Sequence, residues 1–321
     1  MNLAFEKSKA YDAFLEFGKA LLSTDTNFPE IPVEVRRILL DIFIAEQTAA
    51  KVFPSITMGS DTVRVYAVGG TVTIYAPGEG TAPTESKLTF NPAIDLVAKE
   101  LVGRSSVSYT AEEEAIVDLV AKTVEHLGKK MAETVDANIL SGKADNSSAA
   151  HLFRGIQFAD GLTGSTTTVG DLAKAAITVD DVNKAITELE ERGYKRLVMF
   201  IHPKAAYHLR KALSDKGLHA TGFDILKDRN IQGLLGLEGI YETRLLEKRN
   251  YNGTTDTTQV TDVIVCDVEE TGIIGYRRNL TVEKDRDIEQ RLTKVVASTR
   301  FAWQIVRNGD AVYKIKNALA Q

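Results

Sequence analysis

The sequence predicts an α+β fold in which an extended β-hairpin is followed by one long amphipathic helix. From Leu88 onward, apolar side chains fall on every second residue, as they do along a strand that buries one face. After Ser108 the period changes, because apolar residues recur at spacings of three and four as far as Ile139. Both elements lie within residues 75–142, and the rest of the chain is expected to be organised around that stretch.

Residues 1–60 come first and are expected to form a mostly helical arm. Apolar residues at helical spacing mark one helix within residues 11–22 and a second within residues 35–43, which Pro54 limits. Isolated helices this short are marginal in water, so each requires a docking surface.

The hairpin follows the arm. Residues 62–68 alternate in polarity, and Gly69 with Gly70 predicts a tight turn. Residues 72–75 and 88–99 are then the two strands of the hairpin, joined by a tip rich in Gly, Pro, Thr and Glu. Because a two-stranded hairpin is at best marginally stable alone, it needs a surface to lie on.

The long helix is predicted from Ala111 to Leu140, about 45 Å at 1.5 Å per residue. Glu112, Glu113 and Glu114 fall in its first turn, where the helix dipole favours negative charge. Ser141 and Gly142 supply the stop. A long helix with one apolar face beside a protruding hairpin leaves much surface uncovered in a single copy.

The second half of the chain predicts a compact helix, strand and helix followed by further strands. Residues 143–170 are loop-rich and mark a change of domain. Thr178 is the expected N-cap of the first helix, and Pro203 the first residue of the second. The predicted strands are residues 195–201, 261–268, 281–284 and 295–306, with turns at Gly272 and Gly275 and a last strand or short helix at 310–316.

Composition describes a folded chain without a strong electrostatic field. Of 321 residues, 44% are hydrophobic, which suffices for the cores of one or two domains. The 39 basic and 44 acidic residues leave a formal charge of -5, so no overall basic field recruits nucleic acid or an anionic membrane. The start of the chain lacks a signal-peptide pattern, and no apolar segment approaches the roughly 20 residues that span a bilayer. The expected compartment is reducing cytoplasm.

No residue pattern predicts a catalytic, cofactor or metal site. Cys266 is the only cysteine and lies in an apolar run, which predicts a buried thiol. His202 and His208 are six residues apart, not the four that place two metal ligands on one helix face, and are expected to be structural surface histidines. Residues 233–239 are glycine-rich without the GxGxxG spacing. Residues 78–87 lack the glycine before lysine of a phosphate loop.

A charged segment near the end of the chain is the one candidate for phosphate contact. Its basic residues are interleaved with acidic ones, which favours a solvated or subunit-facing strand instead. The segment contains Arg277, Arg278, Lys284 and Arg286 beside Glu283, Asp285 and Asp287.

Six blocks of the sequence, in order, resemble the major capsid proteins of tailed bacteriophages and related archaeal viruses, whose fold encapsulin shells also use. The resemblance rests on the order of the blocks. The blocks are APGEGTAPTESKLTF (76–90), AKELVGRSSVS (98–108), ETVDANILSG (133–142), TVDDVNKAITELEERGYKRLVMFIHPKAAYHLRKALSDKG (178–217), TGIIGYRRNLTVEKD (271–285) and RFAWQIVRNGDAVYKIKNAL (300–319).

The resemblance implies the tailed-phage major capsid fold in five parts. These are an N-terminal arm (1–60), an extended hairpin loop with its base (61–102), a peripheral domain with a spine helix (103–150), an axial α/β domain (151–270) and return strands of the peripheral domain (271–321). It also implies a structural shell subunit, not an enzyme, that self-assembles into hexamers and pentamers of an icosahedral head enclosing double-stranded DNA. An encapsulin-type compartment enclosing a cargo enzyme is the alternative, and an enzyme with an unrecognised site a remote one.

The implied partners are chiefly other copies of the chain. Glu79, Thr81, Glu85, Lys87 and Phe90 of the loop are expected to contact a neighbouring subunit, and Phe14, Phe17 and Leu21 of the arm a neighbour or a scaffold. Scaffold, portal and protease proteins are further partners, DNA is enclosed without sequence-specific binding, and no membrane partner or cofactor is expected. The protein would reside in the virion capsid after assembly in the host cytoplasm. Because no long charged segment precedes the arm, either a separate scaffold assists or a leader is removed.

Overall fold

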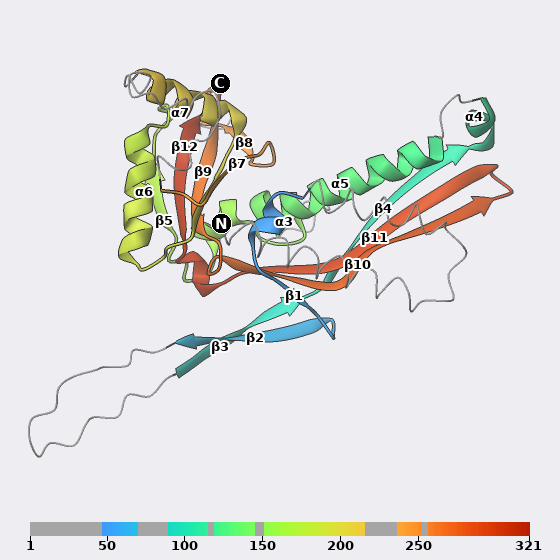
Figure 1. The fold of residues 1–321 in the computed structure, drawn as a ribbon, viewed down its shortest axis with the longest axis horizontal. Coiled ribbons are helices and arrows are strands. Elements are labelled where there is room, and N and C mark those ends of the chain that lie inside the picture. The colour runs from blue at the N-terminus through green and yellow to red at the C-terminus, as the bar shows by residue number, and fades with distance from the viewer. Residues whose placement is uncertain (1–46, 70–88, 115–118, 145–150, 216–235, 252–255) are drawn as a thin grey trace, which may run out of the picture. The chain divides into compact units, whose positions relative to one another are not determined.

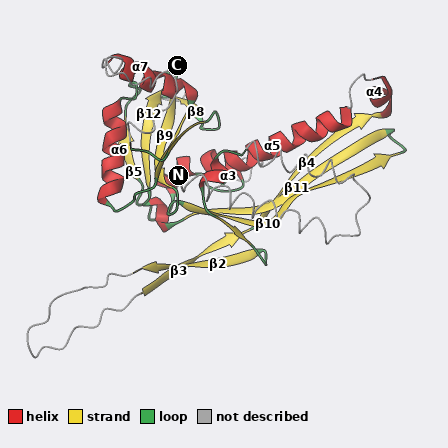
Figure 2. Ribbon diagram, viewed as in Figure 1, coloured by secondary structure: helices red, strands yellow, loops and turns green. Residues whose placement is uncertain are grey.

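The computed structural model describes residues 47–69, 89–114, 119–144, 151–215, 236–251 and 256–321 (Figure 1). Figure 2 distinguishes the helices from the strands. The helices are α3 (Ala49–Val52), α4 (Tyr109–Glu114), α5 (Leu119–Ser141), η2 (Ile156–Gly161), α6 (Val179–Glu191), α7 (Pro203–Asp215) and η4 (Arg307–Gly309). The strands are β1 (Ser55–Thr57), β2 (Thr62–Gly69), β3 (Thr89–Val97), β4 (Lys99–Ser108), β5 (Thr168–Asp171), β6 (Leu197–Ile201), β7 (Gly239–Glu242), β8 (Lys248–Asn250), β9 (Gln259–Asp267), β10 (Gly272–Asp287), β11 (Leu292–Ile305) and β12 (Val312–Leu319).

Residue contacts divide the chain into two units. Among the described residues, unit 1 holds those within 100–132 and 278–300. Unit 2 holds those within 47–99, 133–277 and 301–321. The strands β10 and β11 and the helix α5 each contribute residues to both units.

Unit 2 contains a mixed sheet of order β5-β12-β9-β6-β7, with β8 paired to β9. The central strand β9 is antiparallel to β12 and β6, and all but its first residue are buried. The helices α6 and α7 cover one face of this sheet and share one hydrophobic core with it (Figure 1). That core includes Leu189 of α6, Leu209 of α7, Met199 and Ile201 of β6, and Val265 of β9.

The predicted helix, strand and helix of this unit are confirmed. Thr178 caps α6 as expected, and Asp181 completes a capping box by accepting from the backbone N–H of Thr178 at 2.9 Å. All five residues of β6 are buried, and α7 begins at Pro203. The final segment, left open between strand and helix, forms the strand β12.

An aromatic cluster packs on the other face of β6, where alternation places Phe200 opposite Met199. The ring of Phe200 stacks on Phe53 with 5.9 Å between centroids and on Tyr241 with 5.4 Å, and Phe53 also contacts Trp303. The indole N–H of Trp303 donates to the backbone carbonyl of Arg154 at 3.1 Å.

The predicted turns at Gly272 and Gly275 are wrong, because Gly272 is the first residue of the 16-residue strand β10 and Gly275 lies inside it. A Cβ on Gly272 would fall 2.3 Å from the ring of Trp303. A Cβ on Gly275 would fall 2.5 Å from the sulfur of Met58. These glycines therefore allow close packing against a strand, which is another recognised role of glycine in a sheet.

Unit 1 combines β4 with parts of β10, β11 and α5. Leu127 and Met131 of α5 are buried, as are Val295 and Ala297 of β11. Gly103 of β4 lets Leu127 approach, since a Cβ there would lie 2.8 Å from a methyl carbon of that leucine. The predicted alternation along β11 is confirmed, with odd-numbered residues buried from Thr293 to Phe301.

The long helix agrees with its prediction at the described ends. Helical residues begin at Tyr109, two before the predicted start, and α5 ends at Ser141. Residues 115–118 between α4 and α5 lie outside the description. The strand β4, which precedes α4, was not predicted as a strand.

The hairpin register corrects the predicted turn at Gly69. The strands β2 and β3 pair antiparallel from Thr62 opposite Val97 to Gly69 opposite Thr89, so Gly69 continues the strand. The predicted strand at residues 72–75 and both predicted arm helices lie outside the described residues.

Candidate assembly surfaces

Most of the predicted contact residues fall outside the part of the chain that is described. Glu79, Thr81, Glu85 and Lys87 of the loop and Phe14, Phe17 and Leu21 of the arm are among these. Phe90 lies in β3 with its backbone opposite Val68, but its side chain is not described. The structure therefore describes the base of the hairpin and the last part of the predicted arm, from Gln47 onward.

The base of the hairpin is buried in a small apolar cluster. Met58, Leu96, Ala98 and Ala302 are its buried members, and Val63 and Val65 of β2 pack against them. Across the hairpin, the guanidinium of Arg64 donates to the carboxylate of Asp95 at 2.7 Å, which lowers the pKa of that carboxyl. The strands β2 and β3 form a two-stranded sheet of their own.

A buried carboxylate fixes the described end of the predicted arm. Asp136 of α5 is 1% exposed, and its Oδ1 accepts the backbone N–H of Ala50 at 3.0 Å while its Oδ2 accepts that of Thr48. Burial raises the pKa of Asp136, and these N–H groups oppose that rise. Four residues of helix α3 and the parallel pairing of β1 with β10 follow. Residues 48–50 are thus held against α5.

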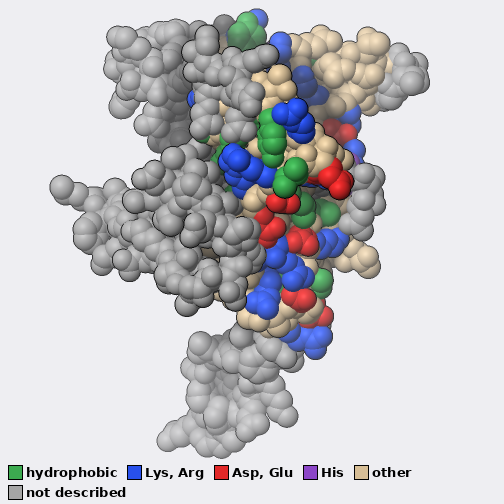
Figure 3. Space-filling view, turned by 90° about the vertical axis from the view of Figure 1, so that its right-hand side faces the viewer, with side chains coloured by type: hydrophobic (Ala, Val, Ile, Leu, Met, Phe, Trp, Pro, Cys, Tyr) green, Lys and Arg blue, Asp and Glu red, His purple; other side chains and the backbone are tan. Residues whose placement is uncertain are grey.

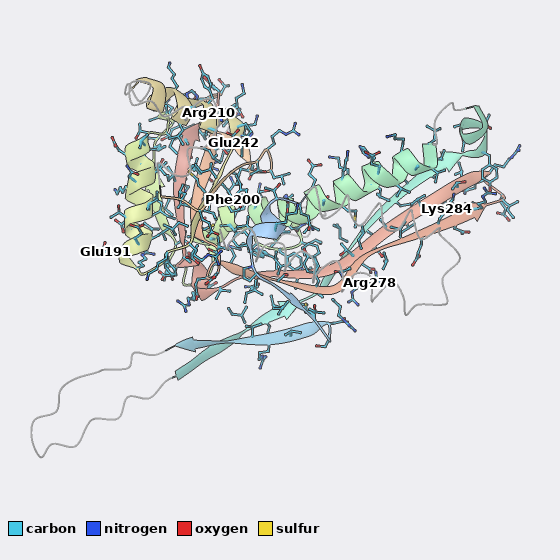
Figure 4. All side chains as sticks on the ribbon, viewed as in Figure 1. Glu191, Phe200, Arg210, Glu242, Arg278 and Lys284 are labelled. Carbon is cyan, nitrogen blue, oxygen red and sulfur yellow. The ribbon has the colours of Figure 1, made fainter. Side chains whose placement is uncertain are left out.

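Two arginines in the charged segment of β10 have partners within the chain. Arg278 donates to Glu100 of β4 and, at 3.0 Å, to the hydroxyl of Ser298. Arg286 lies over the ring of Tyr109 at 5.9 Å. Figure 4 shows the labelled side chains of Arg278 and Lys284 along this strand. These partners agree with the predicted charged strand better than with a phosphate site.

Metal-ligating side chains are not clustered in the described residues. No group of three or more His, Cys, Asp or Glu among them could hold a metal ion. Cys266 is buried in β9, as predicted, and burial raises the pKa of its thiol. The glycine-rich residues 233–239 lie partly outside the description. No described helix is both long and apolar enough to cross a membrane.

The prediction of a surface position for His202 is wrong. This side chain is 5% exposed at the end of β6, and its Nδ1 accepts the backbone N–H of Lys204 at 3.2 Å. Burial lowers its pKa. His202 thus stabilises the start of α7, whereas His208 lies on α7 with its ring against Tyr207.

A buried ionic cluster in unit 2 has no counterpart in the predictions. Asp262 of β9 is fully buried and accepts two hydrogen bonds from Arg249, at 2.7 and 2.8 Å. Lys314 of β12 lies 3.5 Å from the same carboxylate and 3.1 Å from Asp160. The backbone N–H of Asn317 donates to Asp262 at 3.2 Å. Every charge in this cluster has an opposite charge beside it. This pairing is typical of a cluster that stabilises the fold.

Comparison with known proteins decides the family. The sequence model of the Phage capsid family matches residues 31–317, which is most of the chain. The chain belongs to the phage capsid family. Its predicted identity as a structural shell subunit, and not an enzyme, is thereby confirmed, as is a homo-oligomeric shell in the virion capsid. The encapsulin alternative is not favoured.

Solved structures share the predicted fold. A structure from Microbacterium phage Oxtober96 is 18% identical with a TM-score of 0.59, and the match covers 84% of this chain and 90% of that one. The capsid structure of cyanophage P-SCSP1u is 15% identical with a TM-score of 0.61, and the match covers 84% of this chain and 87% of that one. A virus-like particle from Pyrococcus furiosus is 12% identical with a TM-score of 0.57, and the match covers 88% of this chain and 97% of that one. The search of curated proteins gave no match.

Proposed function

We propose that this capsid protein forms the hexamers and pentamers of an icosahedral head around packaged double-stranded DNA. The observation that carries the shell contacts is the hairpin of β2 and β3, which forms a sheet separate from the others. Its described apolar contacts lie at the base, around Met58 and Leu96, and the two strands form a separate sheet. Since a two-stranded hairpin is marginal alone, the part of it beyond this base is stabilised by a neighbouring subunit.

The charge distribution supports enclosure of DNA without tight binding to it. The formal charge of the chain is -5, and Arg278 and Arg286 of β10 already have partners within the chain. On the face shown in Figure 3, basic and acidic side chains are intermixed. A wall of this kind does not draw the many phosphate contacts on which strong nonspecific binding depends.

The remaining parts of the proposal follow the family. The loop residues Glu79, Thr81, Glu85, Lys87 and Phe90 contact a neighbouring subunit, and the arm contacts a neighbour or a scaffold. Scaffold, portal and protease proteins act in assembly, which takes place in the host cytoplasm. The five-part division into arm, loop, peripheral domain, axial domain and return strands belongs to the same proposal.

Purified protein tests the proposal directly. The chain, expressed alone and then with its own scaffold or protease if its genomic neighbourhood encodes them, is expected to form closed particles in cryo-electron micrographs. Symmetry analysis should resolve sixfold and fivefold rings, and particles from infected cells should contain DNA. Monomers or dimers under all assembly conditions would contradict the shell, and a cargo enzyme in place of DNA would restore the encapsulin alternative.

Deleting residues 78–86 is expected to leave the subunit folded and to abolish or strongly reduce shell formation. The deleted residues lie beyond the described part of β2 and β3, so the pairing from Thr62 to Gly69 keeps its partners. Circular dichroism checks the fold, and sedimentation velocity checks assembly. Replacement of the same nine residues by a Gly/Ser linker of equal length separates loss of contacts from loss of length. Particles of normal yield from both variants would rule out this role.

A further inference from the structure

We propose that the outer faces of α6 and α7 bind each other between neighbouring copies of this chain. The acidic face of α6 in one copy would meet the basic face of α7 in the next copy. This inference rests on the proposed shell function, and it adds which surfaces join the copies within a ring. Both helices belong to unit 2.

The outer face of α6 carries three acidic residues and one lysine, with the adjacent Glu190 and Glu191 in its last turn. Val182, Ala185, Ile186 and Leu189 are buried against the sheet, and the exposed residues recur on the opposite side at spacings of three and four. The exposed residues are Asp180, Asn183, Lys184, Thr187, Glu190 and Glu191. Within the described part of the chain, neither Glu190 nor Glu191 has an ion-pair partner.

The outer face of α7 is basic and carries an exposed aromatic ring. Ala205, Ala206 and Leu209 face the core, whereas Lys204, Tyr207 and Lys211 are exposed at spacings of three and four. Tyr207 is 57% exposed. Among the described residues, neither Lys204 nor Lys211 has an ion-pair partner, and Arg210 beside them pairs with Glu242 of β7.

Charge complementarity favours a second copy as the occupant. The acidic residues of α6 in one copy and the lysines of α7 in the next have opposite charge, so these two different surfaces attract each other. Contacts between different surfaces generate rings when the rotation closes. Figure 4 labels Glu191 near one end of α6 and Arg210 on α7. An exposed tyrosine within the basic face is also the kind of side chain that anchors interfaces.

Charge reversal tests the pairing. The α6 variant carries Glu190→Lys with Glu191→Lys, and the α7 variant carries Lys204→Glu with Lys211→Glu. Either is expected to raise the subunit concentration needed for assembly at least about tenfold, because like charges would then face each other. The loss should shrink near 1 M salt, where charges are screened beyond about 3 Å. The variant with all four changes is expected to assemble like the wild type.

Misfolding does not explain such a result. Lysines in the last turn of α6 and a glutamate in the first turn of α7 both suit the helix dipole. Thermal unfolding of the unassembled subunits checks this directly, and it should show little change in any variant.

A mixture of the two reversed variants provides a geometric test. If they alternate around a ring, every α6 face meets an α7 face of opposite charge. The two variants can alternate all the way around a ring of six. In a ring of five, two copies of the same variant must be neighbours at one contact, where like charges meet. The mixture is therefore expected to form sixfold rings and to be deficient in fivefold ones.

Several outcomes would overturn the inference. If the wild type forms shells and both reversed variants assemble equally well, the two faces do not join copies, although the shell function stands. If both reversed variants fail and the fourfold change does not rescue them, each face meets a different occupant, such as a scaffold protein. A wild-type chain that forms no shell under any condition overturns the proposed function together with the pairing.

Discussion

Replacing Asp262 by alanine is expected to lower the free energy of unfolding by about 3–5 kcal/mol, because it removes one partner of a buried ionic cluster. Arg249 would lose both of its hydrogen bonds to the carboxylate, and Lys314, which is 3% exposed, would lose one of its two acidic neighbours. The backbone N–H of Asn317 would lose an acceptor as well. Denaturant unfolding of the unassembled subunit measures the change.

Asp256 provides a matched control for this aspartate. It also pairs with a basic residue, Lys174 at 2.8 Å, but that lysine is half exposed. Exposed pairs contribute little to stability. Asp256→Ala is therefore expected to change the unfolding midpoint far less than Asp262→Ala. Equal effects at the two positions would show that burial does not determine the cost.

The same cluster predicts a pH dependence. Burial alone would raise the pKa of Asp262, but the hydrogen bonds from Arg249 and the charge of Lys314 bring it below its ordinary value. The unfolded chain then takes up the proton first as pH falls. The stability contributed by ionised Asp262 is thus complete above about pH 4 and is lost as pH falls further through the folded-state pKa. The Asp262→Asn variant should lose less stability than the wild type in that acidic range.

Replacing Gly142 by alanine is expected to destabilise the subunit by about 3 kcal/mol through a clash with backbone. A Cβ at this position would lie 2.2 Å from the carbonyl oxygen of Phe153 and 2.7 Å from that of Asn138. The N–H of Gly155 donates to the carbonyl of Gly142 at 2.7 Å, and the side chain of Asn138 accepts from the N–H of Leu152 at 2.8 Å. The returning chain is thus held directly against the last turn of α5.

Gly59 serves as the control for that substitution. A Cβ there would meet nothing within 4 Å, and its backbone needs no left-handed conformation. Gly59→Ala is therefore expected to be neutral or slightly stabilising, through the lower entropy of the unfolded chain. Thermal unfolding of both variants decides the matter, and a Gly142→Ala protein as stable as Gly59→Ala would contradict the close approach.

The elements that the sequence predicts best are those with a strong local signal. Thr178 with Asp181 marks the start of α6, and the uniformly apolar β6 marks a buried strand, because both signals lie within a few neighbouring residues. The end of the long helix at Ser141 is equally local. Periodicity therefore identifies these elements without knowledge of their partners.

The errors arise where distant residues decide the structure. Gly272 has the same local signature as a turn glycine, and only the ring of Trp303 explains its place in a strand. Gly69 pairs with Thr89, which is twenty positions away in the sequence. The adjacent glycines Gly69 and Gly70 look locally like a turn and give no information on that pairing. The cluster around Asp262 joins residues from η2 to β12, and no spacing rule connects them.

Because Cys266 is buried, the reactivity of its thiol can be used to detect opening of the sheet. The only thiol lies on the central strand β9, between β12 and β6, with a pKa raised by its surroundings. A thiol reagent can reach this side chain only when these strands separate. The labelling rate of Cys266 therefore measures how often the sheet opens within an assembled particle. A second cysteine introduced at an exposed position would react with the reagent while the buried Cys266 does not. A spectroscopic probe can therefore be attached at one site without replacing the native cysteine.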